Sequence, residues 1–318
     1  DTLHEEAKGV LEFLRKNKVE VRMFTGDHRA IGERIGKELG LKKSQIFSEI
    51  LPKDKYELIN EAKKKHVVAA TGDGVNDLPA IKSANVGIAV SNAVDALKSS
   101  ADIVLLNSSI AVIKDAIIEA RKIFSRVYSY SVYRISESFR LIITIAILGI
   151  VYKTYPLTPI QLIILALLND IPIISLAFNR VKAASIPAKI DVRGRFILSS
   201  LFGLVGVVNS LLLFAIMTQF LHLDWNDIQT IFFLKLAVSG HLLIYVAHTE
   251  ERWYKFLPSK EVILATLATQ LIATFMAYEG IFVNKISVNW IIFVWIWAIF
   301  WMQVGELVKV FVKKFIKK

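Results

Sequence analysis

Long apolar runs in the last two thirds of the chain constrain its fold more than any other feature of the sequence. Five of them lie at about 157–178, 196–221, 228–247, 262–283 and 288–308, and a sixth ends at 141–152. Each approaches or exceeds the roughly 20 residues that a helix needs to cross a bilayer. Apolar residues make up 54% of the 318 residues, which is high for a soluble protein. The sequence therefore predicts an all-α bundle of six transmembrane helices in a lipid bilayer.

The first of these helices begins well before its apolar part. After Ile110, apolar residues recur at helical spacing through Ile123 and Val127 and into the run at 141–152. We therefore expect one long helix that is cytosolic at first and then enters the membrane. This places a domain boundary between a soluble part at 1–122 and six transmembrane helices at 123–318.

The charges of the loops predict how the helices are oriented. The net charge of +11 could indicate a nucleic-acid partner, but the basic residues gather at the ends of apolar runs, so we expect no nucleic acid. By the positive-inside rule, both termini and the soluble domain of this multi-pass membrane protein are expected to be cytosolic. The chain has no cysteine, so disulfides and thiolate metal sites are excluded. The basic residues on the cytosolic side are Arg180, Lys182, Lys189, Arg193, Arg195, Arg252, Lys255, Lys260, Lys309, Lys313, Lys314, Lys317 and Lys318.

In the first third, candidate strands alternate with candidate helices. Strands are predicted at 19–24, 46–47, 66–70, 86–90 and 103–106, and helices at 3–16, 30–39, 52–65 and from 77 onward. This alternation predicts a Rossmann-type α/β domain with a parallel sheet between helices. Ligands of such sheets gather at the carboxyl ends of the strands.

One turn in this domain carries several oxygen ligands. The sequence TGDGVNDLPA at 71–80 follows a predicted buried strand and opens a helix. Asp73, Asn76 and Asp77 all leave this turn, and their oxygens are the kind of ligand that Mg²⁺ prefers. The start of the following helix would also favour phosphate. The alternative is an ordinary turn in which an aspartate caps the helix.

Two further segments would meet this turn at the same edge of the sheet. Thr25 follows a predicted strand and precedes Gly26 and Asp27, so that its hydroxyl could hold a phosphoryl oxygen. Lys55 lies at the start of a helix, where its ammonium could neutralise phosphate charge. Taken singly, Thr25 could be only a turn residue and Lys55 only a solvated helix lysine.

Together and in this order, the three segments resemble the later motifs of P-type ATPases, a branch of the haloacid dehalogenase superfamily. The resemblance implies ATP as substrate, phosphate roles for Thr25 and Lys55, Mg²⁺ binding by Asp73 and support from Asp77 in the same loop. It also implies that Asp27, after the Thr-Gly pair, orients the incoming nucleotide domain. The phosphorylated aspartate of that family lies in an Asp-Lys-Thr-Gly-Thr sequence, which this chain does not contain. We therefore expect an upstream part with the actuator domain, the nucleotide domain and four membrane helices, and no phosphoenzyme from this chain alone.

Ionisable residues in the first two membrane helices are candidates for ion transport, because charges at membrane depth are costly and usually functional. Arg140 and Asp170 lie equally far along the chain from Tyr155, where the predicted turn falls, so two antiparallel helices would place them at similar depth. Glu137 lies about one turn from Arg140 and could pair with it or with Arg134. The alternative is a structural ion pair that only holds the two helices together.

A proline next to the acid strengthens this candidate site. Pro172 cannot hydrogen-bond to the carbonyl of Leu168, and a freed carbonyl beside Asn169 and Asp170 is a common way to build an ion site. The other polar residues of these helices have simpler explanations. We expect Lys235 to extend to the membrane surface and the remaining ones to be packing or interface residues, namely His241, His248, Gln270 and Glu306.

The segments RISESFR at 134–140 and LLNDIPI at 167–173 resemble the plasma-membrane proton pumps, in their archaeal and bacterial form. That resemblance implies that Asp170 accepts and releases the proton and that Asn169 holds its protonated form. Arg140 would be the counter-charge that drives release and blocks backflow. Asn179 departs from the pattern, where related pumps often have an acid, and could alter proton uptake. Two alternatives stay open: a pump for another monovalent cation, and a non-catalytic membrane half-pump.

Overall fold

A computed structural model describes residues 6–107, 111–153, 155–183 and 192–316. Two compact units divide between Ala120 and Arg121, close to the predicted boundary after residue 122. The predicted helix start at 3–5 and the basic residues Lys189, Lys317 and Lys318 lie outside the described residues.

The strands of the first unit are all parallel, as predicted, but the described residues form two sheets instead of one. β1 pairs with β2, and β3, β4 and β5 form a second sheet with β4 in the middle. The predicted strand at 19–24 is shortened because the backbone carbonyl of Val21 accepts a hydrogen bond from the side chain of Gln45 (3.0 Å). The strands are β1 (Met23–Phe24), β2 (Ile46–Phe47), β3 (Ala69–Gly72), β4 (Val86–Ala89) and β5 (Ile103–Val104).

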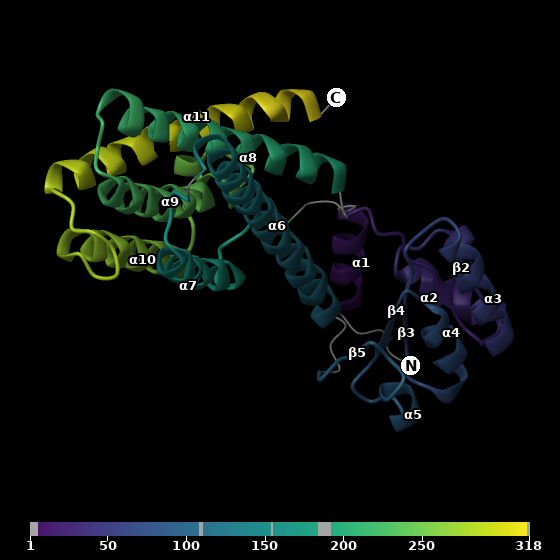
Figure 1. Cartoon of the computed structure of the whole chain (residues 1–318). Coiled ribbons are helices and arrows are strands. Elements are labelled where there is room, and N and C mark those ends of the chain that lie inside the picture. The colour runs from purple at the N-terminus through teal and green to yellow at the C-terminus, as the bar shows by residue number, and fades with distance from the viewer. Residues whose placement is uncertain (1–5, 108–110, 154, 184–191, 317–318) are drawn as a thin grey trace. The chain divides into compact units, whose positions relative to one another are not determined.

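Helices connect these strands and cover them (Figure 1). The small core beside the three-stranded sheet contains Ile81 of α4, Ala89 of β4 and Leu97 of α5. The sequence did not predict α5, because four residues are too few to show helical periodicity. The helices are α1 (Glu6–Lys16), α2 (Arg29–Glu38), α3 (Pro52–Lys63), α4 (Leu78–Ser83) and α5 (Asp95–Lys98).

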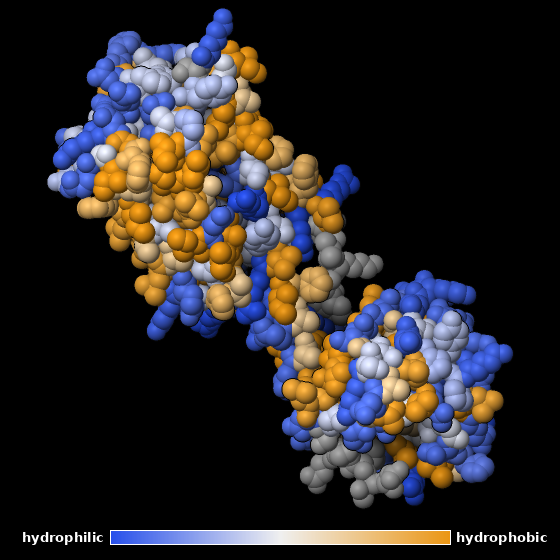
Figure 2. All heavy atoms as spheres, turned by 60° about the horizontal axis from the view of Figure 1, so that its bottom comes forward, coloured by the Kyte–Doolittle hydropathy of each residue, from blue (hydrophilic) through white to orange (hydrophobic). Residues whose placement is uncertain are grey.

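The second unit contains the six helices that the apolar runs predicted, and each is long and apolar enough to cross a membrane. Figure 2 shows the broad hydrophobic surface that these helices present. The long helix α6 runs without a break from Ala111 to Tyr152, which confirms the prediction of one continuous helix. The helices are α6 (Ala111–Tyr152), α7 (Pro159–Ser175), α8 (Val192–Ala215), α9 (Trp225–Ala247), α10 (Lys260–Glu279) and α11 (Val288–Ile316).

Helix α9 forms the centre of the bundle. It packs against α7, α10 and α11, and the side chains of Ile231, Phe232, Phe233 and Leu234 are completely buried. A helix that is apolar on all sides is stable when it is surrounded by other helices. Polar groups on α9 are therefore held away from both water and lipid, and must find partners within the protein.

The turn before α7 is well defined. Thr158 caps the helix, since its hydroxyl accepts a hydrogen bond from the backbone of Gln161 (3.3 Å) while the Gln161 side chain accepts one from the backbone of Thr158 (2.9 Å). Pro159 occupies the first helical position, where no backbone donor is needed. These contacts fix where α7 begins and so the depth at which its polar residues lie.

Candidate functional site

The predicted magnesium turn and the predicted phosphate lysine meet in the first unit. Lys55 Nζ donates to Asp77 Oδ1 at 2.9 Å, and the two side chains are only 16% and 19% exposed. Asp77 lies in a single 3₁₀ turn (Val75–Asp77) that joins β3 to α4. Lys55 is therefore not an ordinary solvated lysine, because α3 holds it against the carboxyl end of β3.

Gly72, the last residue of β3, makes this arrangement possible. A Cβ atom at Gly72 would lie 2.6 Å from both Cβ and Oδ2 of Asp77. The missing side chain lets Asp77 fold back over the end of the strand and reach Lys55.

We expect Gly72→Ala to displace Asp77, break its contact with Lys55 and destabilise this end of the sheet by about 1–3 kcal/mol, the usual cost of overpacking. Amide hydrogen exchange of β3 in the complete protein measures the effect. Gly74→Ala is the matched control, because its Cβ would meet only the backbone nitrogen of Asn76 at 4.0 Å. Equal protection of β3 in the two variants would contradict the role assigned to Gly72.

The loop after β1 is organised around Thr25. The Thr25 hydroxyl donates to Asp27 Oδ2 (3.0 Å) and accepts from the backbone of Asp27 (3.1 Å). The backbone carbonyl of Asp27 accepts from the backbone of Glu49 (3.0 Å), and a hydrogen bond from His28 lowers the pKa of the Glu49 carboxyl. Asp27 and Gly26 are exposed, so this loop is accessible to a ligand or to another domain.

The two loops are connected through the segment before α3. The backbone of Ile50 donates to the carbonyl of Thr25 at 3.1 Å, and Pro52 then begins the helix that carries Lys55. The structure thus brings Lys55 and Asp77 into contact. Within the described residues, the side chains of Thr25 and Asp73 form no hydrogen bond or ion pair with Lys55 or Asp77.

The oxygen atoms of the turn fit a magnesium ion only in part. Asp73 and Asn76 are exposed, whereas Asp77 is already engaged by Lys55. The three predicted ligands thus have different surroundings, and Mg²⁺ binding by Asp73, Asn76 and Asp77 stays a prediction. A small oxygen set of this kind suits Mg²⁺, which usually keeps several waters and binds through few protein ligands. Within the described residues, no group of three or more His, Asp or Glu side chains is arranged for a metal.

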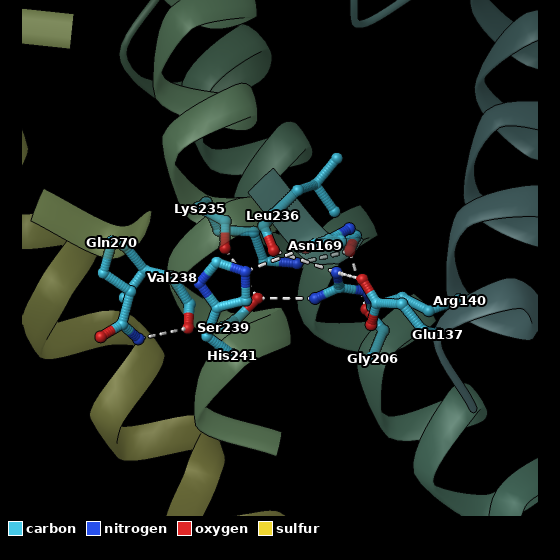
Figure 3. Close-up of polar contacts among 11 residues, drawn as sticks. Glu137, Arg140, Asn169, Gly206, Lys235, Leu236, Val238, Ser239, His241 and Gln270 are labelled. Atoms are coloured by element: carbon cyan, nitrogen blue, oxygen red, sulfur yellow. Dashed lines mark hydrogen bonds and ion pairs between the residues drawn. The ribbon is translucent and has the colours of Figure 1, made fainter. Parts of the chain in front are cut away.

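In the second unit, Arg140 is the centre of a buried polar cluster (Figure 3). Its guanidinium is ion-paired with Glu137 on the same helix and is only 4% exposed. It also donates to Ser239 Oγ (2.7 Å) and to the backbone carbonyl of Leu236 (3.1 Å), both on α9. Of the two partners that the sequence allowed for Glu137, the structure selects Arg140, whereas Arg134 is exposed.

The structure does not show the ion pair between Arg140 and Asp170 that the alternative interpretation of these helices required. Asp170 is exposed on α7, while its neighbour Asn169 is buried and contacts His241 Nε2 at 3.1 Å. Equal distance from the turn places two residues at similar depth, but consecutive residues of a helix point about 100° apart. Here Asn169 takes the inward direction and Asp170 the outward one.

The chain is similar to known proteins over its whole length. Two family models, both described as haloacid dehalogenase-like hydrolases, match residues 1–85 and 57–117. A protein of Methanocaldococcus jannaschii named as a cation-transporting ATPase is 38% identical over all of this chain and 43% of its own length. The chain is therefore homologous, over its whole length, to part of a protein named as a cation-transporting ATPase. A protein of Dictyostelium discoideum named as a plasma membrane ATPase is 31% identical over 92% of this chain and 32% of its own length.

The chain thus spans less than half the length of these two relatives. A solved structure of the catalytic domain of a CPx-ATPase is 32% identical, covers 36% of this chain and 44% of that one, and gives a TM-score of 0.34. The first unit of this ATPase homologue is a haloacid dehalogenase-like domain, and the second is a bundle with six candidate membrane helices.

Two polar residues of α9 have larger roles in this ATPase homologue than the sequence indicated. His241 bridges Asn169 of α7 and Thr269 of α10 through its two ring nitrogens, at 3.1 and 3.2 Å. Lys235 does not extend to the surface, because it is completely buried and its Nζ donates to Ser210 Oγ at 2.5 Å. The spacing of Lys235 and Ser239, one turn apart on α9, was the available signal for a polar face on this helix.

Asn179, which departs from the pattern of related pumps, joins several helix ends. Its side-chain oxygen accepts from the backbone of Ser259 (3.0 Å), and its backbone carbonyl accepts from Arg126 Nε (3.0 Å). Its amide also lies 3.4 Å from Nδ1 of His248, which follows α9. Asn179 therefore ties the end of the α7 region to α6, α9 and the start of α10.

The remaining polar residues fit the packing roles expected for them. Gln270 donates to the backbone carbonyl of Val238 at 3.2 Å, and Glu306 is ion-paired with Lys309 at 2.8 Å. The Gln270 contact connects α10 to α9, whereas the pair of Glu306 and Lys309 lies within α11.

Proposed function

We propose that this chain is the C-terminal portion of an ATP-driven, proton-exporting pump, in which Asp170 carries the proton. The observation that supports it best is the buried guanidinium of Arg140, whose charge is compensated by Glu137 and which α9 holds in place. A fixed positive charge at this place repels a metal ion. A proton is compatible with it, because a bound proton only neutralises a carboxylate.

The cytosolic chemistry in this proposal is the formation and hydrolysis of an aspartyl phosphate. The phosphorylated aspartate and the nucleotide domain are supplied by a part of the protein outside this chain. Thr25 and Lys55 bind phosphoryl oxygens, with Asp77 holding Lys55 in position. Asp73 and Asn76 bind Mg²⁺, which neutralises phosphate charge when it is present. Gly26 and Asp27 form the exposed turn that meets the nucleotide domain.

In the membrane, the proposal assigns separate tasks to neighbouring residues. Asp170 takes up and releases the proton, and Asn169 supports its protonated form. This requires α7 to rotate during transport, because Asn169 now contacts His241 while Asp170 faces outward. Arg140 and Glu137 provide the fixed charges that favour release. The proposal puts the soluble domain and both ends in the cytosol, which the basic loops support. The protein lies in the plasma membrane, and the actuator domain and four further membrane helices complete the pump.

One alternative changes the cargo to another monovalent cation. The name of the M. jannaschii relative is compatible with this alternative, because it mentions a cation without saying which one. The other alternative is a non-catalytic half-pump. Genomic DNA upstream of Asp1 that encodes an in-frame Asp-Lys-Thr-Gly-Thr sequence would rule out the half-pump.

Reconstitution of the complete protein into liposomes tests the proposal. We expect ATP to acidify the lumen of vesicles in which the nucleotide sites face outward, in buffers without sodium or potassium. A pH-sensitive dye in the lumen measures this. Transport that requires sodium or potassium and leaves lumenal pH unchanged would contradict proton export.

A further inference from the structure

A small cavity lies within the second unit, between α6, α8, α9 and α11. Its volume is about 40 Å³. One water needs roughly 10–15 Å³ of such space, so the cavity has room for a small ion with some hydration. The polar residues that line it are Ser136, Arg140, Asn209, Ser239 and Trp301, and the rest of the lining is apolar or glycine.

Two of these residues have a buried N–H group without an acceptor, and a third, Asn209, lines the cavity as well. Arg140 Nε and Trp301 Nε1 are buried without a hydrogen-bond partner among the described residues. The side-chain oxygen of Asn209 already accepts from the indole of Trp297 at 2.6 Å, which leaves the NH₂ group of Asn209 for the cavity. Unpaired buried donors are rare and costly, so their presence around one cavity indicates a missing acceptor.

The lining offers few acceptors in return. Its two hydroxyls, those of Ser136 and Ser239, donate to backbone carbonyls of their own helices at 2.6 and 2.7 Å. Ser239 Oγ also accepts from Arg140. A water in the cavity must donate as well as accept, whereas an anion only accepts. The donor-rich lining therefore suits an anion better than water.

Two basic side chains, Arg140 and Lys235, are buried in this region. The carboxylate of Glu137 compensates the charge of Arg140. Lys235, which is nearby and completely buried, contacts Ser210 Oγ and the ring of Phe232. No carboxylate lies within ion-pair distance of Lys235 among the described residues. Buried charges in proteins are normally paired. A buried lysine without a counter-ion is more stable in its neutral form. The inference therefore rests on the unpaired N–H donors of the cavity and on the guanidinium of Arg140.

We propose that this cavity binds one small inorganic anion of the halide class, with chloride as the physiological ligand. The N–H groups of Trp301, Asn209 and Arg140 would donate to it. The volume excludes larger organic anions. The site is separate from Asp170 and does not depend on the identity of the transported ion.

Thermal unfolding of the complete protein in detergent tests the site, with chloride replaced stepwise by gluconate at constant ionic strength. A ligand that binds only the folded state raises the unfolding temperature with its concentration. We expect chloride to stabilise the wild type, and Trp301→Phe to weaken the apparent affinity for chloride by roughly tenfold or more, through loss of one hydrogen bond to an ion. Trp295→Phe is the matched control, since its indole lies on the same helix but donates to Thr274 and does not line the cavity.

Crystals grown in bromide provide the direct observation. We expect an anomalous scattering peak between α6, α8, α9 and α11 in the wild type and a weaker one in Trp301→Phe. Three outcomes would overturn the proposal: no bromide peak in the cavity, an unfolding temperature that does not depend on chloride, or equal chloride dependence in the wild type and Trp301→Phe. Any of these would leave the cavity as a water site only.

Discussion

Replacing Asp170 by asparagine is expected to abolish ATP-driven acidification by the reconstituted complete protein, while phosphorylation of the protein continues. Asparagine keeps the size and polarity of the side chain but cannot take up and release a proton at physiological pH. The phosphate-side residues lie in the other unit and are unchanged, so phosphorylation from ATP should persist. Lumenal dye fluorescence measures transport, and acid-stable labelling with radioactive ATP measures the phosphoenzyme.

Asp224→Asn is the control for loss of a carboxylate from the same unit. Asp224 is exposed before the start of α9 and makes no side-chain capping bond. Its variant should acidify vesicles at the wild-type rate. Undiminished acidification by Asp170→Asn would refute the role given to Asp170 and make Glu137 the next candidate, because it is the acid that the structure places against Arg140.

Replacing Glu137 by alanine is expected to destabilise the complete protein by about 3–5 kcal/mol, because it leaves the guanidinium of Arg140 buried without its counter-charge. Replacing Glu137 and Arg140 together by methionine should recover most of this loss, since neither charge is then buried. Together with the single variants Glu137→Met and Arg140→Met, the double variant gives the coupling between the two side chains. Unfolding in detergent, followed by circular dichroism, provides the stabilities.

An exposed ion pair of the same unit serves as the comparison. Lys182 and Glu251 lie 2.7 Å apart with side chains 67% and 44% exposed, and the hydrogen bond from Lys182 lowers the pKa of Glu251. Solvent screens such pairs, so Glu251→Gln should destabilise the protein far less than Glu137→Ala. If Glu137→Ala cost as little as Glu251→Gln, the ion pair with Arg140 would not be a significant element of the bundle.

Some features of the site could be predicted because they depend on residues close together in the sequence. The turn at 71–80 places Asp73, Asn76 and Asp77 together whatever surrounds it, and the spacing of Glu137 and Arg140 on one helix puts them within reach. The contact of Lys55 with Asp77 depends instead on how α3 packs against α4, which no local pattern contains.

Other features could not be predicted because they depend on the rotation of a helix about its axis. Asn169 and Asp170 are adjacent in a largely apolar helix, and the sequence does not show which of them faces inward. The contact between Nε2 of His241 on α9 and Oδ1 of Asn169 determines that Asn169 is the residue that faces inward. For the same reason Lys235 was expected at the surface, whereas α9 is enclosed by its neighbours and keeps it inside.

By itself, the sequence determined the six apolar helices, the unbroken α6 and the parallel strands of the first unit, because composition and periodicity act within single segments. Only the tertiary structure decided that the strands form two sheets, that Arg140 pairs with Glu137 instead of Asp170, and that unpaired donors surround a cavity. These outcomes depend on contacts between segments distant in the chain, where the cost of burying a charge or a donor selects the partner.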